Sequence, residues 1–296
     1  VGALTSNTYR YKTRPWEMQH VSTACTHCSN GCKTTLGVRN DEIIRANNRD
    51  RSGINGEFLC VKGRYAFDFT ASEERLQSPL LKINGRHEAI SWSRALSIAA
   101  EKLGAAKASN GQIGVIADTR LTNEELFYLQ KFSRNVLGSS NIDHARSGDL
   151  VTLLDALSGS EDSLATTADL YQTKAALVIG SDLSQQHPLL AFQLRADVRH
   201  HNASIYTVTP GPVREANYSK TSVISPVGQE LEALAGLSEQ LKGEKEVVIL
   251  FGDSIKGQKV RDLVAWASEL GIPVKYVCLV DYSNSRGAMD MGAMPD

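Results

Sequence analysis

Cysteine, proline and aromatic residues are all sparse in this chain of 296 residues, which contains 5 Cys, 8 Pro and 6 % aromatic residues. Five cysteines are too few to hold a chain of this length together as a disulfide scaffold. The fold must therefore rest on hydrophobic cores, and the length is enough for about two domains.

Long apolar runs and an excess of one charge are also missing. No apolar run approaches the roughly 20 residues that span a bilayer, and residues 1–20 contain no apolar segment typical of a secretory signal. The 32 basic residues balance the 33 acidic ones, which argues against a surface for nucleic acid or anionic lipid. We expect no nucleic-acid partner and no direct membrane insertion. Because the first residue is Val1 rather than Met, we also expect part of a longer protein.

Four of the five cysteines lie within 36 residues, at Cys25, Cys28, Cys32 and Cys60, with the spacing C-x2-C-x3-C-x27-C. Zinc sites usually present two close pairs of ligands. Here three thiols share one loop and the fourth is distant, as in a [4Fe–4S] site with all-thiolate ligation. The sequence favours an iron–sulfur cluster, and it leaves open a zinc ion or thiols without a metal.

Two further residues near these cysteines have less specific explanations. His27 lies inside the motif and is expected to be a loop residue beside the cluster, since four thiols already complete the ligand set. The fifth cysteine, Cys278, stands in an apolar run and is expected to be a small buried hydrophobic residue.

The composition and the predicted secondary structure of the chain change near residue 76. Residues 1–75 are polar and rich in Gly, Asn and Arg, and two short strands flank a hairpin turn at residues 39–41. Beyond residue 76, apolar strands near 113–118, 175–181, 203–209, 247–252 and 274–280 alternate with helices, including those over 188–201, 228–242 and 257–270. This alternation predicts an α/β fold with parallel sheets that helices cover on both faces.

The cysteine motif followed by residues 60–64, CVKGR, resembles the cluster domain of the molybdopterin oxidoreductase superfamily. That superfamily includes formate dehydrogenases, periplasmic nitrate reductases and the large iron–sulfur subunit of respiratory complex I. The segment from Gly180 to Pro188 is similar to the family's G-x6-H-P loop, and the resemblance covers most of the chain. It implies a small β-rich [4Fe–4S] domain followed by Rossmann-like α/β lobes.

Two stretches resemble the complex I version of the family, the large iron–sulfur subunit. They are residues 1–5 with 11–17, VGALT and YKTRPWE, and the loop at residues 284–295. The resemblance implies a middle fragment of that subunit. It also implies four parts: a [4Fe–4S] domain at 1–75, the first half of an α/β domain at 76–140, an inserted α/β domain at 141–243, and the truncated second half at 244–296.

The resemblance implies electron transfer or cluster-supported structure within NADH:quinone oxidoreductase. Partners would be the other peripheral-arm subunits, on the cytoplasmic side of the inner membrane, and the fragment alone would be inactive. A true molybdopterin enzyme, such as a formate dehydrogenase or nitrate reductase, is the alternative enzyme, and a zinc-stapled assembly scaffold is the alternative without catalysis.

Lys62 occupies the position at which the family's active members carry an electron relay between the cluster and the pterin. The residue-level alternative is a loop lysine that neutralises thiolates or pairs with a carboxylate. The family's usual metal ligand corresponds to Gly148, so the resemblance implies no molybdopterin here. Ser147 and Asp149 are neighbouring candidates that are better explained as the N-cap of the next helix.

The loop that begins at Gly180 contacts the nucleotide arm of the pterin in relatives. A strand, a glycine turn and a helix N-terminus can together cradle phosphate, but the G-x-G-x-x-G fingerprint is missing. The alternative is an ordinary strand-to-helix turn with Pro188 near the start of the helix.

Overall fold

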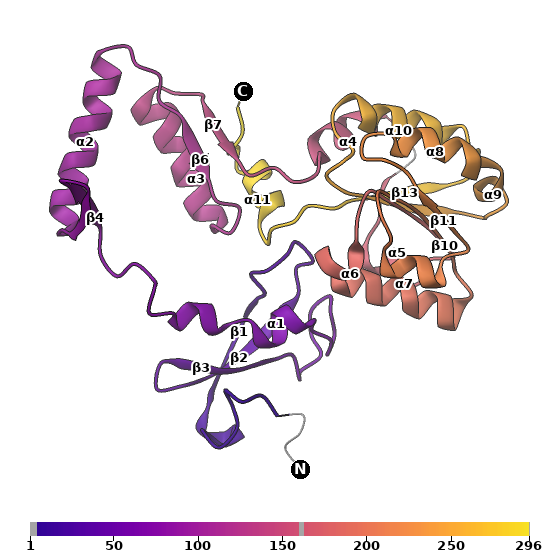
Figure 1. Cartoon of the computed structure of the whole chain (residues 1–296), viewed down its shortest axis with the longest axis horizontal. Coiled ribbons are helices and arrows are strands. Elements are labelled where there is room, and N and C mark those ends of the chain that lie inside the picture. Colours follow the sequence, from indigo (N-terminus) through magenta and orange to yellow (C-terminus); the bar gives the residue numbers. More distant parts are fainter. Residues whose placement is uncertain (1–4, 160–162, 296) are drawn as a thin grey trace.

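The computed structural model describes residues 5–159 and 163–295. Three parts follow one another along the chain: a small β-rich region, an open α/β part and a lobe built on a six-stranded sheet (Figure 1). The small β-rich region followed by α/β parts agrees with the fold class that the sequence predicts. No helix in the described ranges combines the length and the apolar character that crossing a membrane requires.

The first part is a three-stranded antiparallel sheet with short helices, and we call it the cysteine region (residues 13–72). Its elements are η1 Pro15–Glu17, β1 Gln19–Ala24, β2 Lys33–Arg39, β3 Glu42–Asn47, α1 Val61–Tyr65 and η2 Asp68–Ala71. The predicted hairpin turn is confirmed, because Asn40 and Asp41 have φ of 51° and 61°. Both values suit the mirror-image turns that join antiparallel strands.

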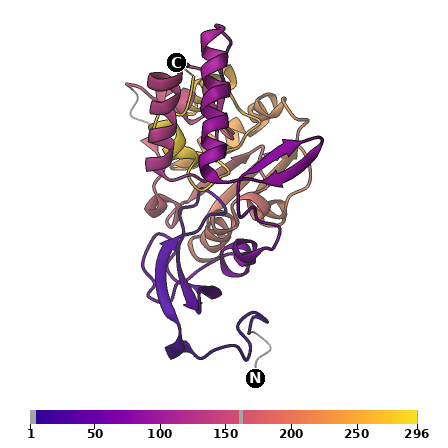
Figure 2. The same cartoon turned by 90° about the vertical axis from the view of Figure 1, so that its left-hand side faces the viewer.

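The second part has few strands and much exposed apolar surface. It contains β4 Leu80–Ile83, β5 Arg86–Ala89, α2 Trp92–Ala108, β6 Val115–Ala117, α3 Asn123–Lys131, η3 Phe132–Leu137 and β7 Ile142–His144. The predicted capping box is present, since Glu125 N–H donates to Thr122 and the Glu125 carboxylate accepts from Thr122 N–H. α2 has no buried residue and stands beside the β4–β5 hairpin (Figure 2).

The third part is the sheet lobe, with strand order β11-β10-β9-β12-β13-β8 and all strands parallel. Its strands are β8 Ser163–Leu164, β9 Ala175–Ile179, β10 Ser204–Thr209, β11 Thr221–Ile224, β12 Val247–Phe251 and β13 Val274–Cys278. Its helices are α4 Leu150–Ala156, α5 Thr167–Leu170, α6 Leu183–Gln186, α7 Pro188–His201, η4 Arg214–Tyr218, α8 Glu230–Leu234, η5 Ala235–Leu237, α9 Ser238–Lys242 and α10 Gln258–Ser268.

Helices cover both faces of this sheet (Figure 1). Along β9, Leu177 and Ile179 face a core shared with α4, α8, α9 and α10, whereas Ala176 and Val178 face a core shared with α5, α6 and α7. Two buried faces explain why the strands are continuous apolar runs without polar alternation.

The predicted end of an inserted domain at residue 243 is wrong. β12 pairs with β9 and with β13, so the strands before and after residue 243 belong to one sheet. The chain leaves the sheet only after β13. α11 Ser285–Asp290 then packs against α3, and Ala288 and Ala293 share a small core with Leu126 and Ile142. The bounds 1–75 and 76–140 stay predictions.

Candidate functional site

Three of the four clustered cysteines lie in the connection from β1 to β2. The N–H of Cys25 donates to the carbonyl of Cys32 at 2.8 Å, which closes this connection into a loop. Gly31 sits in the left-handed region at φ 67°, where a side chain would be strained. The backbone thus folds Cys25, Cys28 and Cys32 around one side of the loop.

Cys60 reaches the same place from the start of α1, where it is the N-cap residue. Its Sγ accepts a hydrogen bond from Gly63 N–H, with a distance of 3.4 Å between the two atoms. A Cβ added at Gly63 would stand 3.4 Å from Cys25 Sγ. The first turn of α1 therefore lies close to the Cys25 thiol.

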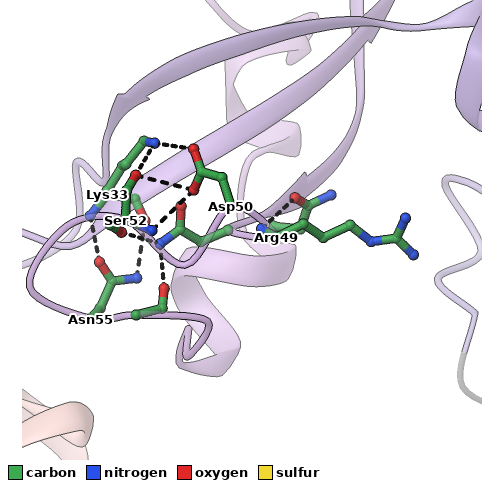
Figure 3. A network of polar contacts seen from close by, with 8 residues as sticks. Lys33, Arg49, Asp50, Ser52 and Asn55 are labelled. Atoms are coloured by element: carbon green, nitrogen blue, oxygen red, sulfur yellow. Dashed lines mark hydrogen bonds and ion pairs between the residues drawn. The ribbon is translucent and has the colours of Figure 1, made fainter.

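The loop between β3 and Cys60 is held by side chains rather than by an apolar core (Figure 3). Asn55 accepts from Lys33 N–H at 2.8 Å and donates to the carbonyls of Lys33 and Phe58. The Lys33 ammonium contacts Asp50 and Ser52. These bonds hold the loop against Lys33, the residue that follows Cys32 at the start of β2. Because the loop leads to Cys60, they help to place Cys60 near the other three cysteines.

All four thiols line one cavity of about 460 Å³ between the cysteine region and the sheet lobe. Its other lining residues are His27, Asn30, Leu59, Lys62, Gly63, Arg120, Gln185, Gln186, Pro188, Leu189, Asp281 and Tyr282. Ser29 donates its hydroxyl to the carbonyl of Val280, and the rings of Phe58 and Phe192 pack with centroids 4.8 Å apart. The predicted ligand set is therefore gathered at a contact between two parts of the molecule.

Burial controls the protonation of three of these thiols. It raises the pKa of Cys25 and Cys28 and brings that of Cys32 to about 11. The Asn30 side chain donates to Cys32 Sγ at 3.2 Å and opposes this shift. Without a bound cation Cys25, Cys28 and Cys32 are thus held as thiols, and a metal must displace their protons.

The arrangement of the four sulfurs fits an iron–sulfur cluster. Four sulfurs surround a shared cavity, and two of them already accept N–H donors, from Asn30 and Gly63, as cluster thiolates do. In residues 5–159 and 163–295, no group of three or more His, Cys, Asp or Glu side chains is arranged to hold one metal ion.

Lys62 lies at the cavity, with its ammonium 3.5 Å from the carbonyl of Gln185. Its charge is among the influences that lower the pKa of Cys28, although burial dominates there. His27 bonds through Nε2 to the carbonyl of Ala66 and is held beside the cavity by the backbone. Cys278 lies outside the cavity against the core of the sheet lobe, and burial raises its pKa to about 12.

The side chains of Ser147 and Asp149 accept hydrogen bonds from backbone N–H groups. Asp149 is the N-cap of α4 and accepts from Thr152 N–H, as predicted, and its other oxygen accepts from Gly257 N–H. Gly148 has φ 76°, and a Cβ there would stand 2.5 Å from the carbonyl of Leu279 and 3.1 Å from Cys278 Sγ. A thiol-bearing side chain at position 148 would therefore not fit.

The Gly180 turn lies where the strand order changes direction, between β9 and β12. Ligands of open α/β sheets bind at such a point. Here Ser254 closes in on Gly180 so tightly that a Cβ would overlap its hydroxyl. The helix α6 that follows has only four residues, and Pro188 begins α7, as the strand-to-helix alternative predicted.

No local pattern in the sequence connects the two loops of the sheet lobe with the cysteines. Gln185 and Gln186 come from the segment 180–188, and Asp281 comes from the loop after β13. His187, between α6 and α7, does not line the cavity but is buried next to it, only 1 % exposed, with Nε2 3.8 Å from Asp281 Oδ1. The sequence shows the pattern at residues 180–188, but it does not show that the cysteines lie beside this segment.

Family models match two consecutive stretches of the chain. Residues 18–72 match the molybdopterin oxidoreductase Fe4S4 domain, and residues 75–270 match molybdopterin oxidoreductase. The chain belongs to the molybdopterin oxidoreductase family. The chain therefore contains an Fe4S4-type domain and belongs to a family of oxidoreductases.

Similar proteins include subunits of NADH-quinone oxidoreductase and of formate dehydrogenases. A subunit of NADH-quinone oxidoreductase from Rhizobium meliloti is 28 % identical across the whole chain, which spans 40 % of that protein. The F420-dependent formate dehydrogenase subunit alpha of Methanocaldococcus jannaschii is 34 % identical, over 66 % of this chain and 29 % of its own length. This chain thus spans well under half of the curated relatives it matches.

The fold also matches a solved structure. Acetylene hydratase from Pelobacter acetylenicus aligns with a TM-score of 0.52 over 93 % of this chain and 38 % of that one, at 17 % identity. At that identity the likeness concerns the arrangement of the backbone alone.

Proposed function

We propose that this chain is the cluster-bearing portion of the large iron–sulfur subunit of NADH-quinone oxidoreductase. Cys25, Cys28, Cys32 and Cys60 would hold one [4Fe–4S] cluster, which carries electrons or stabilises the fold. The observation that carries the proposal is the convergence of four thiols, from the β1–β2 loop and the start of α1, on one cavity.

Two observations favour the complex I relatives over a pterin-dependent enzyme. Relatives named as NADH-quinone oxidoreductase subunits match the full chain, whereas the formate dehydrogenase matches two thirds of it. In addition, the backbone at Gly148 leaves no room for a metal-binding side chain. We therefore propose that no molybdopterin binds and that Ser147 and Asp149 are not metal ligands.

Residues around the cavity would then support electron transfer without chemistry on a substrate. Lys62 places a cation beside the thiols, which stabilises added negative charge. The partners would be other peripheral-arm subunits, and the chain would lie at the cytoplasmic side of the inner membrane through them. The isolated fragment would not oxidise NADH.

Metal analysis of one anaerobic preparation tests the cluster. After reconstitution with iron and sulfide, we expect about four irons per chain and a band near roughly 400 nm that dithionite bleaches. Cys28→Ala should lose the iron. Cys278→Ala, which removes the thiol outside the cavity, should retain it. One tightly bound zinc per chain with no iron uptake would instead support the zinc-stapled scaffold.

A pterin-dependent reductase is the second candidate, and the likeness to formate dehydrogenase subunits favours it. Molybdenum in the metal analysis, or pterin fluorescence after oxidative release, would support that candidate and contradict ours. We expect neither.

A further inference from the structure

One buried ionisable group near the cavity has no role in the cluster proposal. His187 is 1 % exposed, and neither of its ring nitrogens has a hydrogen-bond partner among the described residues. Its backbone is satisfied, since its N–H donates to the carbonyl of Leu183 at 2.8 Å. Burying an imidazole without hydrogen-bond partners costs free energy.

The carboxylate of Asp281 lies close to the His187 ring, slightly beyond hydrogen-bond distance. His187 Nε2 lies 3.8 Å from Asp281 Oδ1, and the Asp281 side chain is 41 % exposed. A proton on Nε2 would therefore face a carboxylate that reaches solvent. Burial first, and the charge of Asp253 second, raise the pKa of Asp281.

Lys62, in the cysteine region, acts on His187 through its charge. Burial, followed by the charge of Lys62, lowers the pKa of His187 to about 4, so the ring is neutral at pH 7. Lys62 also acts on Cys28. Further charged groups around Asp281 are Asp253 and Lys256, and Arg120 lines the cavity with Lys62. The charge of the Lys62 ammonium thus acts on both the His187 imidazole and the Cys28 thiol.

We propose that His187 takes up one proton from solvent, by way of Asp281, when one electron enters the cluster held by the four cysteines. The proposal rests on the proposed function. A one-electron donor supplies the electron, and the proton binds Nε2 and closes the gap to Asp281. Added negative charge at the cluster offsets the repulsion from Lys62, which makes the imidazolium form favourable.

The consequence is a reduction potential that depends on pH. Burial and the charge of Lys62 hold the pKa of His187 at about 4, and the negative charge that reduction adds to the cluster raises it. Between these two pKa values the reduced state binds one more proton. Each unit of pH then changes the equilibrium up to tenfold, which corresponds to about 59 mV for one electron. The potential should fall as pH rises from 5 and level off above the pKa of the reduced state.

Potentiometric titration of the reconstituted full chain, followed by electron paramagnetic resonance from pH 5 to pH 8.5, tests this. His187→Gln should give a potential that no longer changes with pH. Asp281→Asn, which keeps the histidine, should shift the sloping range to lower pH. Iron content and the visible spectrum show whether each variant is loaded and folded.

Two matched controls separate His187 from other histidines. His201→Gln alters the opposite end of α7, and His27→Gln alters the histidine inside the cysteine motif; both should keep the slope. A flat potential in the unmodified chain, or a slope that disappears only in His27→Gln, overturns the inference while leaving the cluster intact. Failure to bind iron at all overturns the cluster proposal and this inference with it.

Discussion

The cysteine region and the sheet lobe show two different ways to order a chain. In the lobe, the five residues of β9 and the five of β12 are all buried, and helices cover both faces. In the cysteine region the buried apolar side chains, apart from two cysteines, are Met18, Ile44, Ala46 and Phe67. Its order comes from turns and polar bonds, and we propose that a cluster held by the four thiols adds to it. The lobe should therefore be stable by itself, whereas the cysteine region should depend on its metal.

The largest expected effect comes from removing one ligand. In the cluster-loaded chain, Cys28→Ala should speed amide exchange in β2, β3 and the loop before Cys60 by at least about tenfold, because the proposed cluster would supply much of their folding free energy. Exchange in β9 and β12 should change little. Hydrogen exchange followed by mass spectrometry measures both at once.

Cys278→Ala is the control for this experiment, because it removes a thiol without touching the cavity. Equal acceleration in β6, β9 and β12 would mean that the molecule unfolds as one unit. Continued protection around Cys60 without metal would mean that the polar bonds alone organise this loop.

A core substitution should show the reverse pattern. Ile249→Ala in β12 removes a fully buried side chain and should lower the free energy of unfolding of the lobe by roughly 2–5 kcal/mol. Ile116→Ala removes the same atoms from a side chain that is 85 % exposed and should cost no more than about 0.5 kcal/mol. Urea unfolding compares them, and similar losses would contradict the burial difference.

A polar substitution tests how much the loop bonds contribute. Asn55→Ala removes three hydrogen bonds and leaves Lys33 N–H without its acceptor, which should cost about 1–3 kcal/mol. The loss should appear as faster exchange of β2 and as weaker iron retention. The exposed Asn141 provides the control, since Asn141→Ala should leave both unchanged. An unaltered iron content in Asn55→Ala would limit the role of this network to local order.

The smallest expected effect lies at the surface of the lobe. Asp169 contacts the Lys275 ammonium, and this bond lowers the pKa of the carboxyl to about 2. Because the pKa is lower in the folded chain than its ordinary value, the stabilisation is present above about pH 4 and is lost as pH falls towards 2. Urea unfolding from pH 5 to pH 2 should show a shallower acid loss in Asp169→Asn. Asp155→Asn, at another surface ion pair, should keep the original slope.

Much of the architecture followed from local patterns. Apolar runs marked the positions of β9, β10, β12 and β13, and the capping box at Thr122 marked the start of α3. The hairpin turn at Asn40 and the cap at Asp149 followed from residue chemistry in the same way. These features depend on neighbours in sequence, so sequence is sufficient to predict them.

Sequence by itself thus determined the alternation of strands and helices, the set of four thiols and the family to which they belong. Only the tertiary structure decided which strands share a sheet, because pairing of β12 with β9 joins residues some seventy positions apart. It alone also placed His187 and Asp281 beside Lys62. Such contacts arise from how the sheet lobe packs against the cysteine region, and no local pattern specifies that packing.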